Sequence, residues 1–313
     1  MLPSLLLLAL PAVPAGAQIV LNPARNEGVI HVDVDLVNVL CAVRDKSGGY
    51  VKGLTEADFE IRQDGKRQAI THFAREVDSP LTVALLLDVS GSVTNVLGEE
   101  KAAAARFFQE VLRPGDGAML VGFAQMIAVW EELTGSKTEL LETLERAGPG
   151  ALPVEDVEYR SRGGTLLYDA VNLVASKKLM RLPGRKVMIL ITDGEDNGSL
   201  EGIGKAVQSA QQADAVVYGI HYKENRLTGF ARDGMGALTR LSEPTGGRAF
   251  HVSEKMPLTK IFAEIADEMR NQYGLGYTPP PGSPDGTFHK LEVKTTKPGL
   301  KAQARSGYFS SGR

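Results

Sequence analysis

Five polar side chains in three separate stretches of this chain have the types that bind a hard divalent cation. They are Asp88, Ser90, Ser92, Thr165 and Asp193. Carboxylate and hydroxyl oxygens suit Mg²⁺, Mn²⁺ or Ca²⁺, whereas zinc prefers ligand sets that contain His or Cys. Two carboxylates balance the charge of such an ion, and hydroxyls add ligands without adding charge. We therefore predict a site for one divalent cation, with Mg²⁺ as the expected ion and Mn²⁺ or Ca²⁺ as alternatives.

Two apolar runs lead into the carboxylates of this predicted site. Residues 83–87 precede Asp88, and residues 187–191 precede Thr192-Asp193-Gly194. Runs that are apolar on both faces are typical of central strands in a parallel sheet. Side chains alternate along an extended segment, so every second residue after Asp88 faces the same way. Water or an acidic group from outside would complete about six ligands, which makes the ion a receptor for a carboxylate.

Neighbouring residues are candidates for supporting the ligands or for forming the rim of the site. These candidates are Gly91, Gly164, Gly194, Glu195 and Asp196. For the stretch Glu195-Asp196-Asn197, the preferred interpretation is a solvated loop that leads into a helix. His221 follows an expected strand and is interpreted as a loop hydrogen-bonder rather than a ligand. The other four histidines are scattered and make no constellation, and no catalytic residue is assigned.

The five ligand candidates resemble the metal-ion-dependent adhesion site (MIDAS) of von Willebrand factor A (VWA) domains. All five motif positions match, and the similarity extends over about residues 81–273. The whole chain is also similar to a family of secreted bacterial proteins called VWFA-related, acidobacterial type. Its segments at residues 273–277 and 306–309 carry this second resemblance. The first resemblance implies a module that binds proteins through the cation.

Strand-like and helix-like segments alternate from about residue 81 onward. This alternation predicts an α/β fold, with a doubly wound, mainly parallel six-stranded sheet flanked by helices in a VWA or Rossmann-like arrangement. Ligands of such sheets lie beyond the carboxyl ends of the strands. Asp88 and Asp193 are expected at two such ends. The stretch from Gly148 to Gly164 is rich in Gly, Pro and charge, and we expect a surface loop there.

The two flanks contain strand-like runs and no long helical period. Asp64-Gly65 is a hairpin signal between residues 59–61 and 69–71. Each flank alone has too few strands to bury a core. We therefore predict one small β-sandwich built from both flanks, with the VWA domain inserted between them. The predicted parts are a β segment at residues 18–78, the VWA domain at 79–273, and a second β segment at 274–313.

Composition and the N-terminal segment indicate where the protein works. A formal charge of −3 gives no electrostatic case for binding nucleic acid or an anionic membrane. Residues 1–17 combine an apolar run with an Ala-Gly-Ala cleavage site, as in a signal peptide, although a basic start is missing. We expect an exported protein, in the periplasm, outside the cell or at the envelope, with no membrane span in the mature chain. Cys41, the one cysteine, is expected to be a buried, inert thiol.

Three functions remain open at the level of sequence. The leading one is an adhesion or protein-interaction module whose bound cation captures an acidic group of a protein or another extracellular ligand. The second is a metal-dependent hydrolase, which is disfavoured because no poised His, Lys or Cys accompanies the site. The third is an envelope assembly scaffold in which the metal is purely structural.

Overall fold

The computed structural model describes residues 36–75, 79–91, 97–149, 157–160, 163–222 and 233–310, with the backbone alone for 157–160. The predicted signal peptide and Ser92, one of the five predicted ligands, lie outside these ranges. Residues Asp35–Arg313 form one compact unit.

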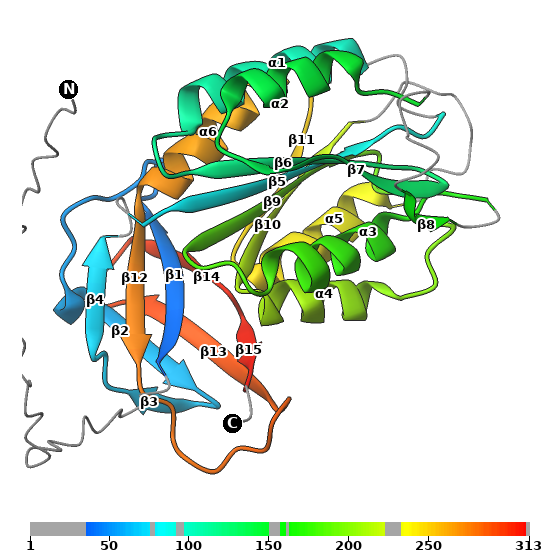
Figure 1. The fold of residues 1–313 in the computed structure, drawn as a ribbon. Coiled ribbons are helices and arrows are strands. Elements are labelled where there is room, and N and C mark those ends of the chain that lie inside the picture. The colour runs from blue at the N-terminus through cyan, green and yellow to red at the C-terminus, as the bar shows by residue number, and fades with distance from the viewer. Residues whose placement is uncertain are drawn as a thin grey trace, which may run out of the picture. The chain divides into compact units, whose positions relative to one another are not determined.

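A seven-stranded sheet lies between two groups of helices (Figure 1), in the strand order β11-β10-β9-β5-β6-β7-β8. Its strands are β5 (Leu81–Asp88), β6 (Gly117–Phe123), β7 (Met126–Thr134), β8 (Val157–Arg160), β9 (Arg185–Thr192), β10 (Ala215–His221) and β11 (Ala249–His251). The five strands from β11 to β6 are parallel, and β7 and β8 are antiparallel to their neighbours. Strands β11 to β7 form the predicted mainly parallel six-stranded sheet, so the fold class is confirmed.

Short β8 extends this sheet by a seventh strand within the stretch that was expected to be a loop. It pairs with β7 through Met126, Ile127 and Ala128, with a register shift after Ile127. The expectation of a loop throughout Gly148 to Gly164 is therefore wrong for these four residues. Backbone hydrogen bonds to an exposed strand edge can order a segment whose composition carries no strand signal.

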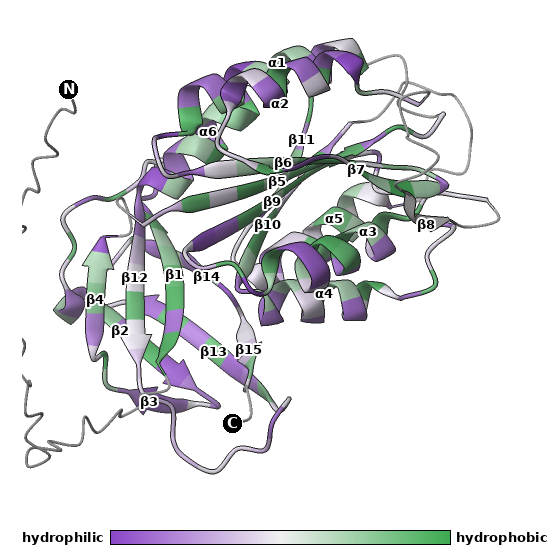
Figure 2. Cartoon of the chain, in the orientation of Figure 1, coloured by the Kyte–Doolittle hydropathy of each residue, from purple (hydrophilic) through white to green (hydrophobic). Residues whose placement is uncertain are grey.

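Helices cover both faces of the sheet. They are α1 (Leu97–Val111), α2 (Lys137–Arg146), α3 (Leu167–Leu173) with a π-helical extension (Val174–Leu179), α4 (Ile203–Gln212), α5 (Gly234–Ser242) and α6 (Leu258–Arg270). Helices α1, α2 and α6 pack on the face that carries Leu85, and α3, α4 and α5 on the face that carries Leu86. The central strands are hydrophobic over most of their length (Figure 2), as a sheet covered on both faces requires, although β9 begins with Arg185 and Lys186. None of the helices in the described residues is long and apolar enough to cross a membrane.

Both flanks contribute to one β-sandwich, as predicted. One sheet has the order β14-β1-β12-β4 and the other β15-β13-β2-β3. The strands are β1 (Val37–Arg44), β2 (Phe59–Gln63), β3 (Lys66–Gln68), β4 (His72–Arg75), β12 (Gln272–Tyr277), β13 (Phe288–Thr295), β14 (Lys301–Ala304) and β15 (Gly307–Phe309). Val39, Ile61, Leu275 and Leu291 from both sheets share one buried core. The domain limits after residues 78 and 273 stay predictions.

The sandwich confirms two local expectations and shifts a third. Asp64 and Gly65 adopt positive φ angles of 51° and 79°, which suits the predicted two-residue hairpin turn. Its second strand is β3, however, so the expected strand at residues 69–71 was placed too late. Cys41 is fully buried, and burial raises the pKa of its thiol to about 12, which leaves it inert as expected.

A buried carboxylate on α6 joins the sandwich to the α/β domain. Glu268 is fully buried and accepts hydrogen bonds from Tyr218 (2.9 Å) on β10 and from Arg248 (3.1 Å) just before β11. From the sandwich side, Arg44 of β1 forms an ion pair with it and Gln303 of β14 donates at 2.8 Å. A buried charge is tolerated only when it is paired and hydrogen-bonded, so this network fixes α6 against both domains.

Glu268→Ala should lower the free energy of unfolding by about 3–5 kcal/mol, because it leaves two arginines next to an uncompensated cavity. Chemical denaturation followed by circular dichroism measures the change. Glu264→Ala is the matched control: its side chain is 32% exposed and, within the part of the chain that the structure describes, pairs with Arg248 alone, so about 1 kcal/mol or less is expected. Equal losses in the two variants would contradict a special role for Glu268.

Candidate metal centre

The pairing of β5 with β9 brings two of the predicted ligands to one edge of the sheet. The two strands are parallel and in register up to Leu87 opposite Ile191. Asp88 therefore ends β5 beside Thr192, which ends β9 and is followed by Asp193. The Thr192 hydroxyl donates a hydrogen bond of 2.5 Å to Oδ2 of Asp88. This is the arrangement predicted from the two apolar runs.

Asp88 is a fully buried carboxyl group. Burial raises its pKa to about 6, and the nearby charge of Asp193 acts in the same direction. Hydrogen bonds from Thr192 and from the Ser90 side chain and amide, the last at 2.9 Å, lower the pKa but do not cancel the effect of burial. Asp88 and Asp193 repel each other when both are ionised, and Asp88 is also removed from water. A cation bound between them would stabilise the ionised form of both carboxylates.

The turn that carries Thr165 is attached to the loop that follows Asp193. Asn197 Oδ1 accepts a hydrogen bond of 2.6 Å from the Thr165 amide, and the amides of Asn197 and Gly198 donate to the Thr165 carbonyl at 3.3 and 3.1 Å. Gly164 has a φ of +87°, and a Cβ there would lie 2.4 Å from Asn197 Oδ1. Only glycine allows this close approach, so Gly164 sets the position of Thr165.

The loop after β9 orients Asp193 through its own backbone. The Glu195 amide donates to Asp193 Oδ1 at 3.0 Å, and the Gly194 amide donates to the Thr192 hydroxyl at 3.0 Å. Asp196 accepts a hydrogen bond of 2.9 Å from the Tyr168 amide in α3. Asp196 and Asn197 therefore hold the Thr165 turn, rather than forming only the solvated loop that the sequence favoured.

The residues present fit a hard divalent cation. Asp88, Ser90, Thr165 and Asp193 lie in segments that meet at the carboxyl edge of the sheet, and Ser92 lies outside the described residues. Within the described ranges, no three His, Cys, Asp or Glu side chains gather as a metal cluster. The two carboxylates would thus depend on Ser and Thr hydroxyls to complete the ligand set, which is the oxygen chemistry that Mg²⁺ accepts.

Glu100 is a buried acid near this site that sequence reasoning missed. It is fully buried on α1, and neither carboxyl oxygen has a hydrogen-bond partner among the described residues. Burial raises its pKa to about 8, and the charge of Asp88 acts in the same direction. A signal was present, because Glu100 shares the helical spacing of the buried residues Ala103, Ala104 and Phe107.

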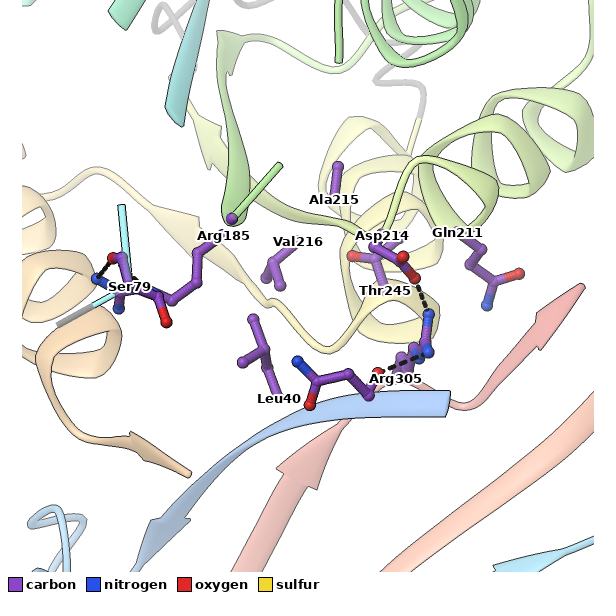
Figure 3. A pocket seen from close by; sticks show the side chains of 11 residues that line it. Leu40, Ser79, Arg185, Gln211, Asp214, Ala215, Val216, Thr245 and Arg305 are labelled. Carbon is purple, nitrogen blue, oxygen red and sulfur yellow. Dashed lines mark hydrogen bonds and ion pairs between the residues drawn. The ribbon is translucent and has the colours of Figure 1, made fainter. Parts of the chain in front are cut away.

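A cavity of about 220 Å³ lies at the opposite edge of the sheet, near the first residues of β9 and β10 (Figure 3). Arg185, Val216 and Leu40 are among its lining residues, and Arg305 forms an ion pair with Asp214 at its rim. None of the predicted cation ligands lines it, so this cavity and the candidate metal centre are separate features.

Glu100→Gln should make stability less dependent on pH. The wild-type carboxyl keeps its proton in the folded state up to about pH 8, whereas in the unfolded chain Glu loses its proton near the ordinary pKa of 4.5. Wild-type stability therefore falls as pH rises between these values, by up to about 1.4 kcal/mol per pH unit. Denaturation in EDTA at pH 5 and pH 8 measures the free energy of unfolding of both proteins. The stability of Glu100→Gln relative to the wild type should be greater at pH 8 than at pH 5.

The exposed neighbour Glu99 supplies the control for this experiment, because Glu99→Gln should leave the wild-type pH dependence unchanged. If wild type and Glu100→Gln lose stability in parallel from pH 5 to pH 8, Glu100 is not held in its protonated form.

Many solved structures resemble this chain, and three of them illustrate the range. An aerotolerance-related membrane protein from Bacteroides fragilis NCTC 9343 is 17% identical, with a TM-score of 0.47 over 60% of this chain and 98% of that one. BatB, a conserved hypothetical protein from Bacteroides thetaiotaomicron, is 20% identical, with a TM-score of 0.46 over 60% and 97%. Proximal thread matrix protein 1 from the mussel byssus, with a zinc-occupied MIDAS motif, is 17% identical, with a TM-score of 0.50 over 66% and 49%. At this identity the mussel protein supports the fold alone.

Sequence comparison identifies the domain. No curated protein matches the chain. The von Willebrand factor type A domain matches residues 82–264, which is more than half of the 313 residues. That range begins at the second residue of β5 and ends in α6, and so includes all of the central sheet except Leu81, with the edge that carries Asp88 and Asp193. The chain therefore belongs to the von Willebrand factor type A domain family.

Proposed function

We propose that this protein is an exported binding module that holds one divalent cation, with Mg²⁺ as the expected ion, through five residues. These are Asp88, Ser90, Ser92, Thr165 and Asp193. The cation would supply an open coordination position that takes a carboxylate from a partner protein or another extracellular ligand. The VWA domain is in general a protein-interaction module rather than an enzyme.

The observation that carries this proposal is the paired acid arrangement at the ends of β5 and β9. Asp88 is fully buried, and the charge of Asp193 disfavours its ionised form. A divalent ion would favour both ionised carboxylates at once. The five protein ligands leave one of about six coordination positions of such an ion open, and a carboxylate oxygen from outside could bind the metal directly there.

The surrounding loops support a preformed site. Glu195, Gly194 and Thr192 fix the side chain and backbone near Asp193, and Asn197 fixes Thr165. We propose that Gly91, Gly164, Gly194, Glu195 and Asp196 position the ligands or form the rim that a partner contacts. A mussel protein of similar fold holds zinc in its MIDAS motif, which is consistent with metal binding at such a motif.

Export is proposed from residues 1–17, on the basis of their apolar run and Ala-Gly-Ala segment. The resemblance to the secreted acidobacterial-type family points the same way. The periplasm, the cell exterior and the envelope surface are all compatible with this proposal.

Asp88→Asn should abolish cation-dependent partner capture while the protein stays folded. The amide keeps the shape of the side chain and an acceptor for Thr192, but removes the charge that would bind the ion. Immobilised wild-type protein should retain ligands from envelope and culture fractions in Mg²⁺ and release them in EDTA. Asp88→Asn should retain none of this set in either buffer.

Asp267→Asn serves as the matched control, because Asp267 is an exposed acid on α6. It should behave as the wild type. Blocking the carboxyl groups of the captured material with a carbodiimide and an amine should also prevent capture. Identical sets of retained ligands for wild type and Asp88→Asn would refute the proposal.

A further inference from the structure

Two histidines that are 30 positions apart in sequence lie side by side at the carboxyl edge of the sheet. His221 ends β10 and His251 ends β11, and the two are direct partners in the parallel pairing of these strands. His221 is also the partner of Thr192 on β9. The expectation that the histidines form no constellation is therefore wrong for this pair, because strand register brings them together.

The ring nitrogens of the pair converge. Nδ1 of His221 and Nδ1 of His251 are 2.9 Å apart, with the ring centroids 5.2 Å apart. The other nitrogen of His221, Nε2, faces the backbone of Gly234, since a Cβ added there would lie 3.2 Å from it. At 2.9 Å the Nδ1 of one ring donates a hydrogen bond to the Nδ1 of the other, so the fold turns one nitrogen of each ring toward its partner.

This spacing is close to that of two imidazoles on one metal ion. Tetrahedral Zn²⁺ with Zn–N distances of about 2.0–2.1 Å holds two nitrogens about 3.3–3.4 Å apart. The pair is about 0.4–0.5 Å closer than that, so a bound ion would replace the hydrogen bond between the rings and separate the two nitrogens by this amount. His251 is exposed, so an ion can reach its ring from solvent, whereas His221 is buried with 7% of its surface exposed.

We propose that His221 and His251 bind a divalent transition-metal ion of the Zn²⁺ class through their Nδ1 atoms. Imidazole is a preferred ligand of Zn²⁺ and Cu²⁺ and a poor one for Mg²⁺ or Ca²⁺. Water or a side chain from a binding partner would fill the remaining positions. This site is chemically distinct from the oxygen site at Asp88 and Asp193. The same edge of the sheet would bind an ion such as Zn²⁺ at the histidines and an ion such as Mg²⁺ at the oxygen ligands.

Calorimetric titration of Zn²⁺ into protein without an affinity tag tests the proposal. Asp88→Asn is used as the background, because it removes the charge of the oxygen site that could also take zinc. This variant should bind one Zn²⁺, and adding His251→Ala should weaken that binding by about 100-fold or more. Loss of a residue that only supports a metal ligand already lowers metal affinity by about 10- to 100-fold.

His72→Ala in the same background is the control, since His72 is an exposed histidine on β4 of the sandwich. It should leave Zn²⁺ binding unchanged. His251→Asn repeats the test with a shorter polar side chain, and circular dichroism verifies the fold of each variant. Absence of Zn²⁺ binding in the Asp88→Asn background, or equal binding with and without His251, would overturn the proposal and leave the proposed Mg²⁺ site untouched.

Discussion

The parallel pairing of β5 and β9 is the constraint on which the candidate metal centre depends. Both strands are buried on both faces, so their register is fixed by packing against helices above and below. That register places a desolvated Asp88 against Thr192 and next to Asp193. A slip of one residue would turn Asp88 toward the opposite helical layer and separate the two acids. Core packing, rather than loop flexibility, therefore sets the distance between the acids.

The sandwich is connected to the same framework through α6. The apolar residues of this helix pack against Leu85 and its neighbours in the core. The same helix carries the buried Glu268 near its C-terminal end. Glu268 accepts hydrogen bonds from Arg44 on β1, Tyr218 on β10 and Gln303 on β14. Helix α6 is therefore attached to both domains. The chain enters the VWA domain from β4 and leaves it directly into β12, and these two strands are paired with each other. The α/β domain is thus attached to the sandwich by the pairing of β4 with β12 and by the buried hydrogen bonds and ion pairs of Glu268.

Sequence reasoning recovered the features that are encoded locally. An apolar run followed by a carboxylate predicts a strand end, and the Asp64-Gly65 pair predicts a hairpin turn, because each depends on a few adjacent residues. The joined sandwich followed from counting strands in the flanks. The fold class and the location of Asp88 and Asp193 at strand ends could therefore be predicted.

Features that depend on tertiary neighbours could not be predicted in the same way. Glu100 and Glu268 are acids on helices, where exposure is the usual outcome, so residue type argues against burial even though Glu100 shares the helical spacing of buried residues. His221 and His251 meet through the register of β10 and β11, and β8 is ordered by the edge of β7. Each of these depends on a partner that is distant in sequence.

The central claim is that the oxygen ligands at the carboxyl edge of the sheet hold a divalent cation. A crystal structure of protein grown with Mn²⁺ tests it most directly, because Mn²⁺ replaces Mg²⁺ and scatters anomalously. The account predicts an anomalous peak among the side-chain oxygens of Asp88, Ser90, Ser92, Thr165 and Asp193, with the nearest ligands at about 2.0–2.2 Å. Ordered side chains at these positions with no anomalous peak between them would contradict it.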